Sequence, residues 1–123
     1  MCFICPNRLI LIVISVLLSG CAEELSFSRD VMPILAKNCL SCHQQGGEGY
    51  AISGFSVETY EDIMKGTNAG AVVEPGYSYA STLQVLVEHR ADPSIAMPRE
   101  AVKMPLSDIQ IIGDWIDQGA QNN

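Results

Sequence analysis

The chain has 123 residues, which is enough for one domain and too few for two full hydrophobic cores. Seven basic side chains against fourteen acidic ones give a net charge of −7, so we expect no binding to nucleic acid, whose phosphates would repel the chain. The same acidity suits a protein partner with a basic docking face, or it serves only to keep a small exported protein soluble.

Residues 1–20 have the pattern of a secretory signal peptide. A single basic residue, Arg8, precedes an apolar run over Leu9–Leu18 with one interruption, and the small residues Ser19 and Gly20 follow. This run is shorter than the roughly twenty apolar residues that a transmembrane helix needs. The segment is therefore predicted to direct export and to be removed.

The stretch Leu18-Ser19-Gly20-Cys21 resembles the bacterial lipobox, in which the cysteine is acylated and becomes the first residue of the mature protein. Several acyl chains hold a protein at a membrane far better than one. Ala22 follows the cysteine, and by resemblance to Gram-negative lipoproteins the absence of Asp there favours the outer membrane. We expect a membrane-anchored lipoprotein of the bacterial cell envelope that faces the periplasm, with residues 21–28 as a lipidated tether. The alternative is an ordinary signal peptide with a chance cysteine near its cleavage site.

Residues 29–123 are predicted to form the single domain, and its first helix runs from a cap at Asp30 to about Asn38. Pro33 then falls in the first turn, where its missing N–H costs nothing. One face of this helix follows the helical spacing of apolar residues with Val31, Ile34, Leu35 and Cys39. The apolar face therefore leads directly into the next motif.

This motif is Cys39-Leu40-Ser41-Cys42-His43, the C-x-x-C-H pattern that attaches c-type haem. Two thiols one helical turn apart can add to the two vinyl groups of one porphyrin, and the adjacent histidine can then face the iron from the same side. If Cys21 carries lipid, Cys39 and Cys42 are the only cysteine pair outside the signal segment. We predict one covalent haem c on Cys39 and Cys42, with His43 as an axial ligand of the iron.

Three other uses of the cysteine pair are less well supported. A structural zinc site needs four ligands, and outside the motif the chain offers only His89 and no further cysteine pair after the tether. A thioredoxin-like redox pair needs a βαβ context, whereas the surroundings of this pair are predicted to be helical. A disulfide between Cys39 and Cys42 can form but would be strained.

Short helices and loops alternate in the middle of the chain. Gln44–Gly54 is rich in glycine and is predicted to be a loop, after which Ser56 caps a second helix over Val57–Lys65. A loop over Asn68–Gly76 precedes a third helix over Tyr79–Val87. The sequence contains no convincing pair of strands. The predicted fold class is therefore all-α, with about four helices around one covalently bound haem.

The irregular stretch Ala91–Lys103 holds the preferred candidate for the second axial ligand. A methionine thioether would close the sixth position on the iron and raise its potential, whereas an open position would admit small ligands. Met97 is preferred because an irregular loop can lay a side chain over a haem and Pro98 stiffens its approach. Met104, His89 and an open position are the alternatives.

The last helix is the best specified of the four. Ser107 and Gln110 have the spacing of a capping box, and Leu106 and Ile111 have that of a hydrophobic staple. Gly119 is predicted to end the helix. Its buried face is predicted to contain Ile109, Ile112, Trp115 and Ile116.

Together these motifs resemble the planctomycete-type cytochromes c, which are small class I-like domains. The similarity covers most of residues 28–120 and is carried by Asp30–Leu35, Cys39–His43, Val73–Gly76 with Ser81 and Leu83, Met97-Pro98, Leu106–Asp108 and Trp115–Ala120. The resemblance implies that the first and last helices cross beside the haem. It also implies an axial methionine in a Met-Pro-Pro stretch, which falls on Met97-Pro98. Here Arg99 replaces the second proline, and the spacing from Met97 to Leu106 is longer than usual.

These features lead us to expect a monohaem cytochrome that carries single electrons between periplasmic or membrane redox partners and is not itself an enzyme. His43 and Met97 would bind the iron, and lipid on Cys21 would bind the membrane. Two alternatives are a haem-based sensor of small ligands and an accessory electron-transfer subunit of a larger oxidoreductase.

Overall fold

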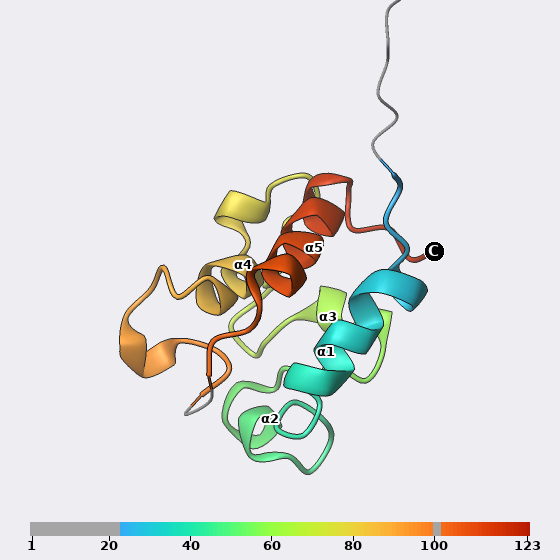
Figure 1. The fold of residues 1–123 in the computed structure, drawn as a ribbon. Helices are drawn as coiled ribbons and strands as arrows, with labels where there is room; N and C mark the ends of the chain where they lie inside the picture. The colour runs from blue at the N-terminus through green and yellow to red at the C-terminus, as the bar shows by residue number, and fades with distance from the viewer. Residues whose placement is uncertain (1–22, 100–101) are drawn as a thin grey trace, which may run out of the picture.

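The structure is a computed structural model that describes residues 23–99 and 102–123. Over these ranges it contains helices and no strand, apart from one isolated bridge between Thr67 and Gly70, so the predicted all-α class is confirmed. The described residues form five α-helices, which are labelled in Figure 1: α1 (Met32–Asn38), α2 (Glu48–Ser53), α3 (Tyr60–Lys65), α4 (Thr82–Val87) and α5 (Leu106–Asp117). Three single helical turns accompany them: η1 (Phe27–Val31), η2 (Ser78–Ala80) and η3 (Pro93–Ile95).

The first helix begins earlier than a cap at Asp30 would allow. Ser26 is the N-cap: its hydroxyl accepts a hydrogen bond from the Arg29 N–H at 3.3 Å. The Asp30 carboxylate in turn accepts from the Ser26 N–H at 2.8 Å, so Asp30 completes the cap from inside the helix. The π-helical turn η1 then runs directly into α1, with Pro33 in the first turn of α1 as predicted.

The core is centred on the side chain of Trp115 in α5, which is fully buried. Its ring lies 5.5 Å from that of Phe27 in η1 and 6.5 Å from that of Tyr60 in α3. Both η1 and α4 pack against α5, so the first and last helices of the domain meet. Other fully buried side chains around them include Val31, Leu35, Ile63, Val87, Ile112 and Ile116.

The predicted buried face of α5 is confirmed, whereas the capping box and hydrophobic staple predicted at its N-terminus are wrong. Ile109, Ile112, Trp115 and Ile116 are all buried. The helix begins at Leu106 with Pro105 at the N-cap position, so it has no side-chain cap. Ser107 lies inside the first turn, where its hydroxyl is 3.4 Å from an Asp108 carboxylate oxygen. Leu106 is 75% exposed and cannot act as a staple. Gly119, with φ of +100°, follows the end of the helix as predicted.

The segment between α1 and α3 differs most from expectation. The predicted loop Gln44–Gly54 contains α2, and the helix predicted over Val57–Lys65 begins only at Tyr60. Thr59, and not Ser56, caps α3, since its hydroxyl accepts from the Asp62 N–H at 3.1 Å. The third predicted helix is divided at Ser81 into η2 and α4.

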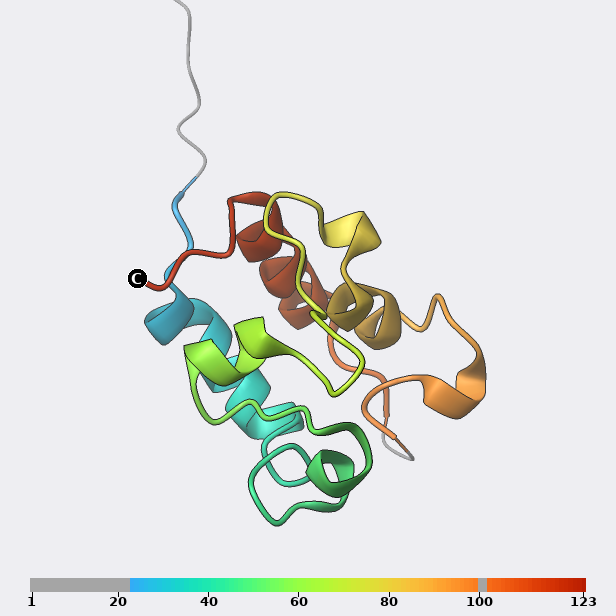
Figure 2. The same cartoon turned by 180° about the vertical axis from the view of Figure 1, so that it is seen from behind.

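The two ends of the described domain lie together at one end of the molecule, and α2 lies at the opposite end (Figures 1 and 2). The predicted signal peptide over residues 1–20 and the predicted lipidation site Cys21 fall outside the described residues. In the part of the chain that is described, we find no helix with the length and apolar character needed to cross a membrane.

Candidate functional site

The Cys39–His43 motif forms a tight turn at the end of α1. The Cys39 N–H donates to the Leu35 carbonyl at 2.8 Å, and the Cys42 and His43 N–H groups donate to the Cys39 carbonyl at 3.2 and 2.9 Å. Residues three and four positions apart in a helical turn are neighbours on its surface. The structure therefore brings Cys39, Cys42 and His43 together, as the motif requires.

The two thiols are free and differ in environment. Cys39 is half-buried beside the core, whereas Cys42 is exposed. Burial, with a smaller contribution from Cys42, raises the pKa of the Cys39 thiol to about 11, so this thiol is neutral at pH 7.

The imidazole of His43 is oriented by a backbone carbonyl. Its Nδ1 lies 3.2 Å from the carbonyl oxygen of Phe55, and because a carbonyl only accepts, Nδ1 carries the proton. The lone pair is then on Nε2, which is the tautomer a histidine needs when it binds a metal through Nε2. The ring of Phe55 packs edge-on to the imidazole at 5.3 Å between centroids and further limits its rotation.

Gly49 of α2 packs directly against the same imidazole. A Cβ atom built on Gly49 would lie 2.8 to 3.0 Å from three atoms of the His43 ring, so no larger residue fits without moving it. The backbone of the motif is also fixed, because the Tyr50 N–H donates to the Cys42 carbonyl at 3.0 Å and the Val57 N–H donates to the His43 carbonyl at 2.8 Å. Together, α2 and the segment after it hold His43 in one position.

Neither Gly49 nor Phe55 was predicted from the sequence to be a functional residue. Phe55 contributes a main-chain carbonyl oxygen, which every residue type possesses, so no sequence pattern could have predicted this contact with His43. The glycines shortly after the motif could have predicted that the backbone packs closely against it, because glycine often occurs where the backbone approaches another group closely. Gly47 shows the same effect, since its Cβ would lie 2.4 Å from the Cys42 carbonyl oxygen.

Met97 lies on a separate loop after α4, just beyond η3. Its N–H donates to the Leu86 carbonyl at 3.1 Å, and its carbonyl accepts from the Nε2 of the exposed His89 at 3.0 Å. The side chain is only partly buried. The backbone of Met97 is thus held at both its amide and its carbonyl.

Met104 has a different environment from Met97. Its side chain is 4% exposed and belongs to the apolar core. A role in packing therefore accounts for Met104 without a role as an iron ligand.

In Figures 1 and 2 the loop with η3 and the segment with α2 project separately from the body of the domain.

Two grooves lie on the surface away from the Cys39–His43 turn. One, of about 420 Å³, is lined by residues of the η3 loop that include Pro93, Pro98 and Arg99. The other, of about 520 Å³, lies between α4 and α5. Neither is lined by Cys39, Cys42 or His43. Within residues 23–99 and 102–123 no group of three or more His, Cys, Asp or Glu side chains is placed so that it could hold a metal ion.

The donors at the Cys39–His43 turn fit haem c better than a bare metal ion. Two adjacent free thiols and one imidazole with a free Nε2 match what covalent haem attachment uses. A family model described as Planctomycete cytochrome C matches residues 39–100, which is just over half of the chain. The matched span begins at Cys39, includes Met97 and ends before Met104. Neither the curated proteins nor the solved structures give a match to this chain.

Proposed function

Because the chain belongs to the planctomycete cytochrome C family, whose members are haem c proteins, we propose that it carries single electrons through one covalent haem. Cys39 and Cys42 would hold the haem covalently, and His43 would bind its iron. The observation that carries this proposal is the hydrogen bond from His43 Nδ1 to the Phe55 carbonyl. It leaves Nε2 available for iron in the same turn as the two thiols.

The residues of the turn have separate tasks. A haem bound here supplies an iron that alternates between the ferrous and ferric states. Cys39 and Cys42 hold the porphyrin through thioether bonds, so a small domain retains it without a deep pocket. The Phe55 carbonyl fixes the His43 tautomer and the orientation of the imidazole ring. Gly49 leaves the space that the imidazole occupies.

Met97 is proposed as the second axial ligand. A thioether in this position raises the potential and closes the iron to small ligands, which favours an electron carrier over a sensor. The partly exposed side chain of Met97 and its location inside the matched span support this choice. Met104 would have to leave the apolar core to reach an iron, and this supports its role in packing.

The cellular setting is part of the proposal. Residues 1–20 direct export, and lipid on Cys21 anchors the domain to the outer membrane on its periplasmic side. No substrate is transformed by the chain itself. After residue 20 the chain has fourteen acidic side chains against six basic ones, so the domain suits a redox partner with a basic docking face, and their association rate should fall as salt rises.

The test is a reduced-minus-oxidised visible spectrum, together with an intact mass, of residues 22–123 exported in a host that matures haem c. We expect a c-type spectrum and a mass increased by one haem. The double variant Cys39→Ser with Cys42→Ser should be colourless, whereas the matched control Ser41→Ala, an exposed residue between the two cysteines, should retain the haem. A colourless wild-type chain whose mass fits two oxidised thiols would overturn the proposal.

A further inference from the structure

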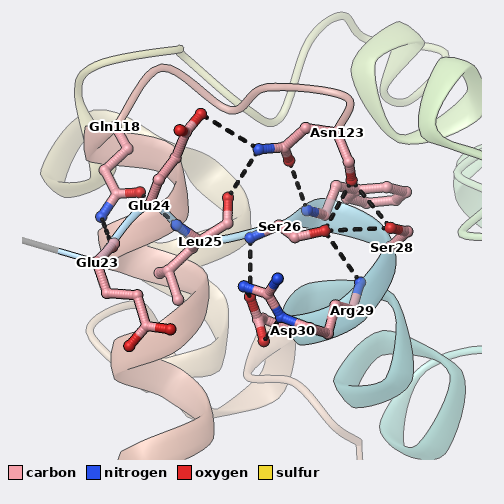
Figure 3. A network of polar contacts seen from close by, with 10 residues as sticks. Glu23, Glu24, Leu25, Ser26, Ser28, Arg29, Asp30, Gln118 and Asn123 are labelled. Carbon is pink, nitrogen blue, oxygen red and sulfur yellow. Dashed lines mark hydrogen bonds and ion pairs between the residues drawn. The ribbon is translucent and has the colours of Figure 1, made fainter.

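The segment Glu23–Ser28, expected to be part of a tether, is held by the last residues of the chain (Figure 3). The side chain of Asn123 accepts from the Phe27 N–H at 2.8 Å and donates to the Leu25 carbonyl at 3.2 Å. The carbonyl of Asn123 accepts from the Ser26 hydroxyl at 2.9 Å and from the Ser28 N–H at 3.1 Å. We call Glu23–Ser28 with Gln118 and Asn123 the terminal clasp.

Gln118 at the end of α5 holds the same segment closer to its start. Its Oε1 accepts from the Leu25 N–H at 2.8 Å, and its Nε2 donates to the Glu23 carbonyl at 3.2 Å. The clasp is also joined to the core, since the ring of Phe27 is buried 5.3 Å from that of Tyr60. The segment is therefore held at Glu23 and from Leu25 onward, so at most the residues before Leu25 remain as a tether.

The remaining tether is short compared with the domain. Four peptide steps separate Cys21 from Leu25, and a fully extended chain covers about 14 Å in four steps. A domain of about 100 residues has a radius of gyration of about 13 Å and is roughly 30 Å across. Such a tether does not allow the domain to turn over on a membrane to which Cys21 is anchored.

The position of the clasp then decides which end of the domain faces the membrane. The clasp lies where the two ends of the described chain meet, whereas the end of α1 and α2, which surround Cys39–His43, lie at the opposite end (Figures 1 and 2). We infer that the terminal clasp orients the anchored domain with its haem-bearing end away from the membrane, so that electrons pass to a protein on the aqueous side and not to a quinone in the bilayer. This inference rests on the proposed haem and on the proposed lipid at Cys21.

The experiment uses the full lipidated holoprotein in vesicles of phosphatidylethanolamine and phosphatidylglycerol that carry a headgroup fluorophore, whose emission haem quenches by energy transfer at short range. A variant with a Gly/Ser linker about as long as the domain is wide, inserted between Ala22 and Glu23, frees the orientation. We expect this variant to show several-fold stronger quenching, and several-fold faster haem reduction by a membrane-confined quinol, than the wild type. Reduction by a water-soluble reductant should be equal in both. Equal quenching and equal quinol reduction would overturn the inference.

A second variant tests the clasp with the original tether length. Gln118→Ala with Asn123→Ala should move both readouts part of the way toward the linker variant. The control Asn122→Ala, which changes the same residue type at an exposed neighbouring position, should match the wild type. If the Gln118→Ala/Asn123→Ala variant and the Asn122→Ala control gave the same readouts, the claim that the terminal clasp orients the domain would be wrong.

Failure of the inference can be distinguished from failure of the proposed function. A haem-containing chain that stays in the membrane after Cys21→Ser would overturn the inference and leave electron transfer intact. A colourless chain would overturn the proposed function. Hydrogen exchange at the Leu25 and Phe27 amides would then still test the clasp, which predicts that both amides are protected.

Discussion

The Cys39–His43 turn and the loop with Met97 differ in how each presents its ligand side chain. The imidazole of His43 is itself held, by the Phe55 carbonyl on one side and the backbone of Gly49 on another. At Met97 the hydrogen bonds reach only the main chain, and the thioether is fixed by packing alone. One side of the proposed site is thus prepared before haem arrives. Changes there should affect haem assembly, whereas changes at Met97 should affect the iron's potential.

The Met97 loop also depends on charged contacts at the surface. The Glu88 carbonyl accepts from Lys103 Nζ at 2.8 Å, which joins the two ends of the loop. The Glu88 carboxylate accepts from Gln84 Nε2 at 2.9 Å and pairs with Arg90. The guanidinium of Arg90 lies 4.4 Å from the ring centroid of Tyr79. The ends of this loop should therefore respond to acid through the Glu88 carboxylate.

The largest effects are expected from replacing the two methionines, and they should differ between Met104 and Met97. Met104→Ala should lower the free energy of unfolding by about 2–5 kcal/mol, because it leaves a cavity in the core, and should retain the sulfur-to-iron band of the oxidised protein. Met97→Ala should cost far less stability but abolish that band. It should also lower the reduction potential by roughly 0.1 V or more, since axial ligands set haem potentials over about 0.8 V. Urea unfolding, visible spectra and redox titration measure these effects, and the reverse pattern would assign Met104 as the ligand.

A smaller effect is expected at Gly49. Gly49→Ala places a methyl group against the His43 ring, so we expect a loss of about 1–3 kcal/mol and a reduced yield of holoprotein. The matched control is Gly113→Ala in α5, where the added Cβ would lie 2.9 Å from Gln84 Nε2. That variant should change stability without changing the haem yield. Equal haem yields in the two variants, measured by absorbance per protein, would show that the imidazole needs no such space.

The smallest effect concerns Glu88 and acid. Burial raises the pKa of its carboxyl, but hydrogen bonds from Arg90 and Gln84 and the charges of Arg90 and Lys103 outweigh this and leave the pKa below 4.5. Because the folded-state pKa is the lower one, the ionised carboxylate stabilises the fold above pH 4.5, and this contribution is lost as the pH falls through the folded-state value. Glu88→Gln should cost less than about 1 kcal/mol at pH 7 and reduce the loss of stability below pH 4.5.

Unfolding in urea from pH 3 to 7 measures this dependence. The control Glu61→Gln, at an exposed position on α3, should keep the wild-type profile. An unchanged acid profile in Glu88→Gln would remove Glu88 as the residue that makes the loop acid-sensitive.

Local patterns predicted the parts of the fold that depend on local spacing. The buried face of α5 and the position of Pro33 follow from helical periodicity and from the missing N–H of proline, and both are confirmed. The cap of the first helix was harder to predict. The side chains of Ser26 and Asp30 can both accept a hydrogen bond from a backbone N–H, and the sequence does not show which of them begins the helix. For α5, Ser107 hydrogen-bonds to the neighbouring Asp108 side chain and so forms no capping box.

The candidate site was predictable only where residue type carries the chemistry. The spacing of Cys39, Cys42 and His43 was sufficient to bring these residues together. In contrast, α2 was predicted to be a loop, because this short helix and its two capping residues contain three glycines and a serine. The position of α2 depends on its contact with the His43 ring, and a local sequence pattern contains no information about such a contact. The dipeptide Met-Pro is the same at Met97 and Met104, and their different burial is visible only in the structure.

The buried indole where the first and last helices meet also gives the protein an intrinsic fluorescence probe. Trp115 is the chain's single tryptophan, and its Nε1–H donates to the Gln121 carbonyl at 3.0 Å. A haem held within the same small domain absorbs at the wavelengths where an indole emits, so emission is quenched while the two are close and returns when the chain unfolds or lacks its cofactor. One fluorescence trace on unlabelled protein therefore reports cofactor loading and unfolding together, from a single known position.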